Sequence, residues 1–235
     1  LEKIFNKNII VSGLSEKAVN ILKLLNYKIY TLNHFYLAND KLHKFKIIKN
    51  PIIKVKYIYR EINFEELHTK RDIQNKSKNL NSKYKDANFF IKKYYKNLYY
   101  NYNFFILNDK LSNKSLLLVV RKININNSTI LRIIDYLGEE KIFMYSRYFM
   151  NILMYANSAE YIDFLNYGTN KKYLFKSGFS ILDYDKTTLP NYFEPFLKKN
   201  KKIYIAHNNE KFFKNVVVCK GDGDQERPNN LNCDY

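Results

Sequence analysis

Residues 116–136 read LLLVVRKININNSTILRIIDY and decide the fold class. Leu116 to Val120 and Ile130 to Tyr136 are apolar runs of strand length, and the polar stretch from Asn124 to Ser128 between them has the composition of a turn. Immediately upstream, Tyr100 to Ile106 alternates aromatic or apolar residues mostly with Asn, as a strand does. These three strands are close in sequence, so we predict an antiparallel meander.

After the meander the sequence changes to helical spacing. Gly138, Glu139 and Glu140 open a helix whose apolar side chains, from Tyr145 to Ala156, share one face. Short strands and one brief helix follow. We therefore predict an α/β (α+β) fold with a mixed, largely antiparallel sheet flanked by helices. The expected elements after this helix are a strand at 161–165, a helix at 170–176, and strands near 181–182, 203–206 and 216–218.

The beginning of the chain repeats part of this plan. A short apolar run at residues 9–11 is followed by Gly13, a helix capped by Ser15, and a strand from Lys28 to Leu37. The later stretch has the same order: strand, Gly168, helix, strand. Two stretches with one plan suggest an internal duplication. Between them, residues 41–86 are polar and basic, which predicts a connector with one short helix around residues 64–67.

The chain is strongly basic. Forty Lys and Arg residues against 22 Asp and Glu give a net charge of +18, which can indicate nucleic acid, anionic lipid or a phosphorylated cofactor. Most of these cations are Lys, and the chain is also rich in Asn, Ile, Tyr and Phe, all of which A- and T-rich codons encode. We interpret much of the charge as genome composition. Because no RRM-like signature or zinc knuckle is present, no nucleic-acid partner is expected.

The expected location is the cytoplasm. No apolar run approaches the roughly 20 residues of a membrane span, and no basic-then-apolar leader is visible, so no integral membrane segment is expected. Cys219 and Cys233 make neither a disulfide framework nor a zinc site. The chain opens on Leu1 rather than Met, so we interpret it as a fragment. A truncated repeat would expose apolar surface, which predicts dimerisation or aggregation.

The polar segment from Gly221 to Asn229 follows a buried strand and contains three carboxylates and an Arg. One interpretation is an acceptor pocket, in which Asp222 and Asp224 hold sugar hydroxyls or an amine and Arg227 holds a phosphate or carboxylate. A tight turn with self-paired charges is the alternative. Calcium is a third interpretation, but Arg227 replaces the Gly of an EF-hand loop and no Glu ends the loop, so no metal is expected.

Other candidates stand alone in the sequence. His34 lies on a predicted strand with Tyr36 on the same face, so it is either a base that orients the acceptor or a satisfied core histidine. Asp135 ends an apolar strand, where a desolvated carboxylate can act as a base or pair with a cation. Alternation places Arg132 on the opposite face, so these two do not pair. Glu194 lies among aromatic residues, which predicts a raised pKa or binding by loop N–H groups.

Several stretches resemble a known family. Ala18-x-x-Ile21 followed by Asn26-Tyr27 resembles the Ala-x-x-Leu-Tyr-x-x-x-Gly-Phe stretch of acyltransferase domains of the GNAT superfamily. From Phe89 onward the order of meander, helix, strand, helix and strand is also similar to that fold. The chain more specifically resembles tandem GNAT-like proteins of bacterial surface-polysaccharide gene clusters. The stretches that carry this match are Leu32–Tyr36, Leu131–Tyr136, Pro190–Phe196 and Gly221–Asn229.

The resemblance implies the domain organisation and the activity. Residues 1–40 would be the C-terminal part of a first GNAT-like repeat, residues 41–86 a connector, and residues 87–235 a second GNAT-like domain. The implied activity is transfer of an acyl group from acyl-CoA, the co-substrate, to an amino sugar or sugar nucleotide in surface-polysaccharide synthesis. The alternative is a GNAT-like sugar- or partner-binding module without catalysis.

The resemblance also implies roles for single residues. The family binds the pyrophosphate of acyl-CoA on N–H groups at a helix N-terminus, and here Gly138 is the one glycine of that turn, followed by two carboxylates that repel phosphate. The family's acid Tyr falls on Leu174, one position after Tyr173. The catalytic candidates are therefore His34, Asp135, Glu194 and Tyr173. The candidates for substrate binding are Tyr36, Asp222, Asp224, Arg227 and Asn229.

Overall fold

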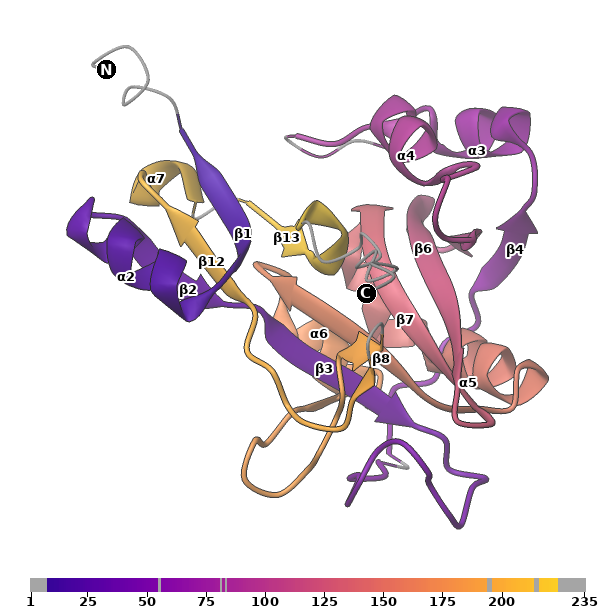
Figure 1. The fold of residues 1–235 in the computed structure, drawn as a ribbon. Coiled ribbons are helices and arrows are strands. Elements are labelled where there is room, and N and C mark those ends of the chain that lie inside the picture. Colours follow the sequence, from indigo (N-terminus) through magenta and orange to yellow (C-terminus); the bar gives the residue numbers. More distant parts are fainter. Residues whose placement is uncertain are drawn as a thin grey trace.

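The described part of the chain contains one large sheet, one small sheet and a hairpin, with helices packed on them (Figure 1). The computed structural model describes residues 8–54, 56–80, 82, 84–193, 196–213 and 216–223. The large sheet has eight strands and the small sheet has three. The hairpin consists of β10 (Tyr192–Phe193) and β11 (Phe196–Leu197).

The large sheet has the strand order β4-β5-β6-β7-β8-β3-β9, and β13 pairs with part of β8. β5, β6 and β7 form the predicted antiparallel meander, whereas β7 and β8 pair in parallel. The predicted mixed α+β class, with a largely antiparallel sheet flanked by helices, is confirmed. The strand bounds are β3 (Asn33–Ala38), β4 (Asn63–Leu67), β5 (Tyr102–Asp109), β6 (Lys114–Ile125), β7 (Ser128–Gly138), β8 (Ala159–Tyr167), β9 (Ser180–Ile181) and β13 (Val218–Cys219).

Helices cover both faces of this sheet. α3 (Lys70–Ser77) and α4 (Ala87–Tyr94) pack on one face, which we call the α4 face. The 3-10 helix η1 (Glu140–Tyr145) and α5 (Arg147–Ala156) pack on the other, the α5 face. The side chains of Thr69 and Asp86 accept N–H groups at the starts of α3 and α4, which fixes where these helices begin.

The small sheet consists of β1 (Ile10–Leu14), β12 (Tyr204–His207) and β2 (Lys28–Thr31), with α2 (Glu16–Leu24) between β1 and β2 in the chain. β12 lies in the middle and is antiparallel to both neighbours. In the large sheet, β3 likewise lies between β8 and β9, which α6 (Lys171–Lys176) connects. Each strand-helix-strand unit thus takes its middle strand from the other half of the chain, so residues 1–40 and 87–235 share both sheets.

Two expected elements differ from the structure. Residues 28–37 do not form one strand, because the N–H of Leu32 donates to the carbonyl of Ile203 (2.9 Å) and the chain crosses from the small sheet to the large one. Residues 64–67 form β4 rather than a helix, because they pair with β5 at the sheet edge. The segment 41–86 therefore contributes a strand and α3 to the fold as well as a connection.

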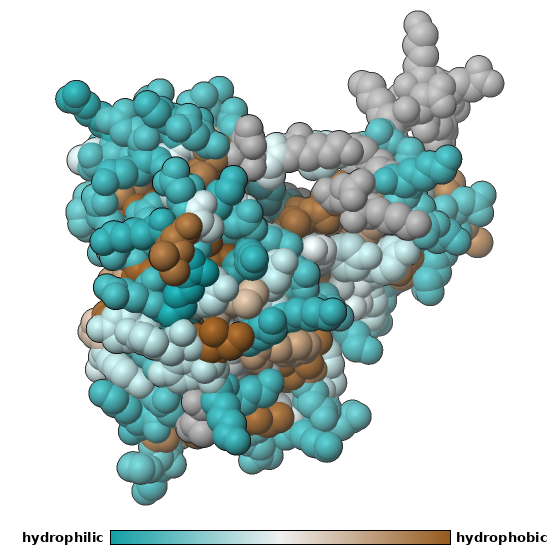
Figure 2. All heavy atoms as spheres, turned by 180° about the vertical axis from the view of Figure 1, so that it is seen from behind, coloured by the Kyte–Doolittle hydropathy of each residue, from teal (hydrophilic) through white to brown (hydrophobic). Residues whose placement is uncertain are grey.

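The face of the molecule opposite to the view of Figure 1 is mostly polar. Seen from behind, hydrophilic side chains cover much of the molecule and hydrophobic ones are scattered among them (Figure 2). None of the helices within the described ranges combines the length and the apolar character that crossing a bilayer requires. The remaining short elements are α7 (Glu210–Phe213) and the 3-10 helix η2 (Lys220–Asp222).

Candidate functional site

The α4 face carries a band of buried charged side chains between two apolar clusters. One cluster lies under α3 and α4, and the other lies beneath β10 and the loop before it. On β7, Ile130 belongs to the second cluster and Ile134 to the first, so the polar side chains lie between them. A buried charge is costly unless it is paired, so each must have a partner. The members of this polar band are His34, Arg132, Asp135 and Asp163.

β7 and β8 diverge at the polar band. Their parallel pairing runs from Thr129 and Ala159 to Ile133 and Phe164, and it ends there. A bulge in β7 at this point shifts its register with β6, so that both residues that follow Ile133 face α4. Beyond the divergence, the edge of β8 that faces β7 pairs with β13 instead. The two strands therefore enclose a gap that widens toward their C-terminal ends.

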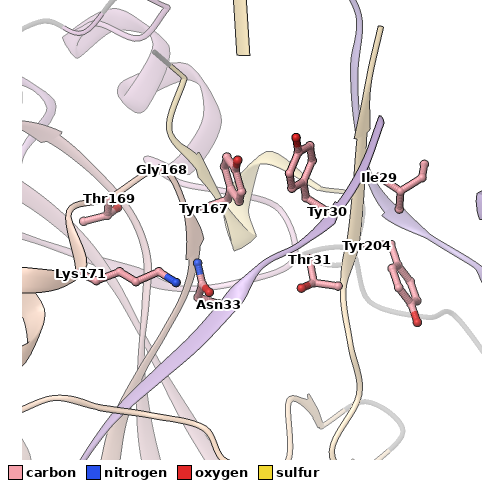
Figure 3. A pocket seen from close by; sticks show the side chains of 9 residues that line it. All are labelled: Ile29, Tyr30, Thr31, Asn33, Tyr167, Gly168, Thr169, Lys171 and Tyr204. Carbon is pink, nitrogen blue, oxygen red and sulfur yellow. The ribbon is translucent and has the colours of Figure 1, made fainter. Parts of the chain in front are cut away.

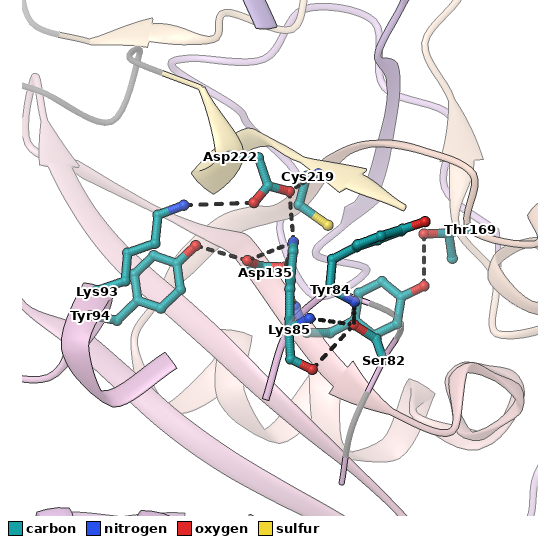
Figure 4. A network of polar contacts seen from close by, with 10 residues as sticks. Ser82, Tyr84, Lys85, Lys93, Tyr94, Asp135, Thr169, Cys219 and Asp222 are labelled. Carbon is teal, nitrogen blue, oxygen red and sulfur yellow. Dashed lines mark hydrogen bonds and ion pairs between the residues drawn. The ribbon is translucent and has the colours of Figure 1, made fainter. Parts of the chain in front are cut away.

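The side chain of Lys85 joins two carboxylates at this gap (Figure 4). Its Nζ lies 2.8 and 2.9 Å from the two carboxylate oxygens of Asp135 and 2.6 Å from Oδ2 of Asp222. The hydroxyl of Tyr94 donates to Asp135 at 2.8 Å, and Asp222 also accepts the N–H of Cys219 at 2.8 Å. The contacts tie the loop before α4 to β7 and to η2. We call Lys85, Tyr94, Asp135 and Asp222 the Lys85 cluster.

The Lys85 cluster contains one cation and two carboxylates, and a second cation, Lys93, lies 3.6 Å from Asp222. Burial by itself lowers the pKa of Lys85, but the carboxylates of Asp135 and Asp222 outweigh it and raise that pKa, so the ammonium stays charged. Burial and the neighbouring Asp135 raise the pKa of Tyr94, which remains a hydrogen-bond donor. Asp135 accepts hydrogen bonds from Lys85, Tyr94 and the N–H of Tyr136. Burial raises the pKa of Asp135 and Lys85 opposes this effect, so Asp135 is held in an ion pair and is not a free base.

Three residues at the same place could offer ligands to a metal ion. Asp135, Cys219 and Asp222 each bring one potential ligand atom within 4.8 Å of the others. However, the ammonium of Lys85 already lies between the two carboxylates, where a cation would bind. Burial also raises the pKa of the Cys219 thiol, and a protonated thiol is a poor metal ligand. The donor set therefore fits an internal lysine better than a metal ion.

A second cluster forms around Asp163, which is fully buried on β8. Arg132 donates two parallel hydrogen bonds to it, from Nε to Oδ1 at 2.8 Å and from Nη2 to Oδ2 at 2.6 Å. Nε2 of His34 lies 2.8 Å from the same Oδ2, and Nη1 of Arg132 donates to the carbonyl of Asn191 at 3.0 Å. Bidentate pairs of this kind are both strong and directional. We call His34, Arg132 and Asp163 the Asp163 cluster.

The protonation states of the Asp163 cluster follow from burial and charge. Burial alone raises the pKa of Asp163, but Arg132 outweighs it and lowers that pKa to about 2. Burial lowers the pKa of His34 although Asp163 opposes this, so the imidazole is neutral at pH 7. An ionised carboxylate can only accept, so Nε2 of His34 carries the proton. Nδ1 then has a free lone pair, and it makes no hydrogen bond with any described residue.

η2 lies between the two clusters. It contacts both β7 and β8, and its Lys220 is close enough to His34 for the charge to lower the pKa of the histidine. At the other end of η2, Asp222 binds Lys85. A methyl group on Gly221 would overlap the Tyr94 hydroxyl, so the chain is tightly seated. Residues 218–222 therefore fill the wide end of the gap between β7 and β8.

The other predicted site residues that the structure describes lie apart from this band, and Tyr36 and Gly138 have roles in the backbone structure. Tyr36 has no exposed surface, and its hydroxyl accepts the N–H of Ile52 at 3.0 Å. Tyr173 is half-buried on α6 and packs against the apolar cluster of the α5 face. Gly138 has a φ of +107°, and any side chain there would overlap the carbonyl of Ser115. The candidates outside the described residues are Glu194, Asp224, Arg227 and Asn229.

The two carboxylates that follow β7 bind one N–H group of their own turn and one at the start of α6. Oε1 of Glu139 accepts the N–H of Lys141 at 3.1 Å. Oε2 of Glu140 accepts the hydroxyl of Tyr136 at 3.2 Å and the N–H of Asn170 at 3.3 Å. A pyrophosphate that used these N–H groups would have to displace a carboxylate.

Two members of the polar band, His34 and Asp135, could be singled out from the sequence, but the partners that hold them could not. Asp163 stands within an apolar strand, and a charge in such a strand is a usable signal. Lys85 stands in a Lys-rich polar stretch and carries no signal of its own. The predicted placement of Arg132 and Asp135 on opposite faces is wrong, because the bulge in β7 breaks the alternation. They still do not pair, since Arg132 binds Asp163 and Asp135 binds Lys85.

No protein-family model matches this chain, and no curated protein matches it in sequence.

Proposed function

We propose that the chain is a GNAT-type N-acyltransferase, which transfers an acyl group from acyl-CoA to an amino sugar or sugar nucleotide in surface-polysaccharide synthesis. The observation that carries the proposal is the divergence of β7 and β8 beyond Ile133 and Phe164. GNAT domains bind acyl-CoA between two splayed strands of this kind. The elements also follow in the order that the resemblance implies: antiparallel meander, helix, parallel strand, helix and strand.

The polar band supplies groups for the chemistry. The acceptor amine attacks the thioester carbonyl, the C–N bond forms, the C–S bond breaks, and the leaving thiolate takes up a proton. A base must remove the proton of the amine. His34 suits this role, because its imidazole is neutral and Nδ1 has a free lone pair. Asp163 orients the ring and would stabilise the imidazolium, while Arg132 keeps Asp163 ionised.

Access to these groups requires movement of residues 218–222. This segment fills the gap that acyl-CoA would enter, and the charge of its Lys220 is close enough to lower the pKa of His34. The contact between Lys85 and Asp222 holds it in place. Withdrawal of one short segment would thus open the donor gap and uncover the base together.

The proposal is tested by binding and by turnover. Acetyl-CoA at 100 times its Kd should stabilise the protein by about 2.7 kcal/mol, seen as a rise in melting temperature. With an amino-sugar acceptor, release of free CoA thiol should fall about 100-fold or more in His34→Asn, as expected for loss of a general base. Lys76→Ala, which removes an exposed ion pair far from the band in sequence, should leave both readouts unchanged. If no CoA thioester shifts the melting temperature, the acyltransferase proposal is refuted.

A second candidate is a GNAT-like module that binds a sugar or a partner without catalysis. The observation that favours it is the filling of the gap by β13 and η2, together with the carboxylate of Glu139 at an N–H group of the turn after β7. The same melting experiment separates the two. If the chain is a binding module, an amino sugar should raise its melting temperature and acyl-CoA should not.

A further inference from the structure

A pocket of about 650 Å³ lies where β2 leads into β3 (Figure 3). Its walls come from β2, from β12 and from the turn between β8 and α6, so both sheets contribute to it. Small-molecule sites typically have volumes of roughly 300 to 1,000 Å³, so this pocket has room for a ligand of one or two sugar rings. Its chemistry is divided into an aromatic wall and a polar wall.

The aromatic wall is rigid before any ligand binds. The rings of Tyr30 and Tyr167 have centroids 5.3 Å apart, and in Figure 3 their hydroxyls point the same way. Behind them, Phe213 stacks on Tyr167 at 4.7 Å and His207 stacks on Phe213 at 4.1 Å. Side chains fixed by such a cluster lose little conformational entropy on binding. Half-buried Tyr rings suit the apolar C–H face of a sugar.

The polar wall offers a cation, an amide and hydroxyls. In Figure 3 the ammonium of Lys171 points toward the amide of Asn33. Neither side chain makes a hydrogen bond or ion pair with a described residue. Thr169 is buried and shares a 3.2 Å hydrogen bond with Tyr136, which links the pocket to β7. No acidic residue is among the described residues that line the pocket.

We propose that this pocket binds a sugar that carries an anionic substituent, a phosphate or a carboxylate. The sugar ring lies on Tyr30 and Tyr167, its hydroxyls bond to Asn33 and Thr169, and Lys171 pairs with the anion. The inference depends on the proposed function only for the biological role of the ligand. Binding itself follows from the chemistry of the two walls.

Calorimetric titration of the whole chain tests the inference with four probes: glucose 1-phosphate, glucuronate, glucose and inorganic phosphate. A charged hydrogen bond to Lys171 is expected to make glucose 1-phosphate or glucuronate bind about 10-fold more tightly than glucose. Whichever of the two binds more tightly identifies the anion. Lys171→Met should remove that difference, and Asn33→Ala should weaken all three sugars. Lys171 is exposed, so its substitution is expected to leave the fold intact.

Lys172→Met is the matched control, because Lys172 is the exposed neighbour of Lys171 and does not line the pocket. Equal weakening by Lys171→Met and Lys172→Met would overturn the proposal and indicate general attraction to a basic protein. Inorganic phosphate that binds as tightly as glucose 1-phosphate would overturn it as well, as would the absence of binding by every sugar. If no sugar binds but acyl-CoA raises the melting temperature, only the proposal of a sugar site in this pocket is refuted. If a sugar binds but acyl-CoA does not raise the melting temperature, only the acyltransferase proposal is refuted.

Discussion

Asp163 depends on Arg132 more than on any other side chain. The pair is buried, bidentate and linked to the backbone through Asn191. Arg132→Met would leave the carboxylate with His34 alone, and breaking a buried pair typically costs about 3–5 kcal/mol. We expect a loss of this size in the free energy of unfolding, measured by urea denaturation at pH 7.

The control for this loss is an exposed pair. Lys76 and Glu65 are 2.9 Å apart, with half of each side chain exposed. Lys76→Ala should cost about 0–1 kcal/mol. A cost below about 1 kcal/mol for Arg132→Met would show that the Asp163 cluster does not hold the sheet together.

Two buried histidines make stability depend on pH. Burial lowers the pKa of His34 and of His207 below the unfolded value of 6.5. Asp163 opposes this effect at His34, and the backbone of Asn209 opposes it at His207. Below pH 6.5 the unfolded chain therefore binds more protons than the folded one, and the free energy of unfolding falls as the pH drops. A gap of one pH unit between the folded and the unfolded pKa corresponds to about 1.4 kcal/mol of stability.

His207→Phe isolates one of these contributions. The Phe ring keeps the stack with Phe213 and Tyr30, and it removes the titratable imidazole, whose pKa burial lowers. We expect equal or greater stability at pH 7 and a smaller loss between pH 7 and pH 5, measured by urea denaturation at both values. A loss as large as that of the unchanged protein would mean that His207 does not titrate in this range. The carboxylate of Asp163 loses its contribution only at lower pH, as the pH falls through its pKa of about 2.

At the scale of elements, the attachment of η2 depends on Asp222. Its Oδ2 binds both Lys85 and the N–H of Cys219. Asp222→Asn removes the charge and should weaken this attachment by about 1.5–3 kcal/mol, the range for hydrogen bonds to charged groups. Amide hydrogen exchange should then accelerate at least about 10-fold at Cys219, while the amides of β6 keep their protection.

Asp183→Asn serves as the comparison for this exchange experiment, because Asp183 belongs to an exposed pair with Lys186 at 3.7 Å. It should leave exchange at Cys219 unchanged. Faster exchange both at Cys219 and in β6 after Asp222→Asn would indicate global destabilisation instead of local opening.

The sequence predicted those elements whose partners are close along the chain. The meander was predicted correctly because β5, β6 and β7 pair with their neighbours through short turns. The strand over residues 28–37 was predicted as one piece because the contact that divides it, between Leu32 and Ile203, is distant in sequence. Residues 64–67 have no strong intrinsic preference, and their pairing with β5 decides their structure.

The same rule applies to the candidate site. His34 and Asp135 could be singled out from residue type and position, because polar residues in apolar strands are unusual. Their partners could not be predicted, since Asp135 and Lys85 are 50 positions apart and His34 and Asp163 are 129 apart. Only the assembled sheet brings these groups within bonding distance.

At the scale of the whole molecule, the exchanged strands couple the two halves. Loss of β12 would leave β1 and β2 without their shared neighbour, and loss of β3 would do the same for β9. We therefore expect a single cooperative unfolding transition in spite of the two sheets. Far-UV circular dichroism and tyrosine fluorescence should give coincident urea curves. Two separate transitions would show that the halves are independent.

The exchanged strands also set an order of events during synthesis. The hydrogen bond between Ile9 and Asn208 spans 199 residues of sequence, and β12 belongs to the same late stretch. At a translation rate of about 5–20 residues per second, β1 and β2 leave the ribosome on the order of ten seconds or more before β12 is made. During that interval their backbone edges have no strand to pair with inside the described fold. The nascent chain must therefore be shielded or slow to collapse, and chaperone supply should determine its yield more than the final stability does.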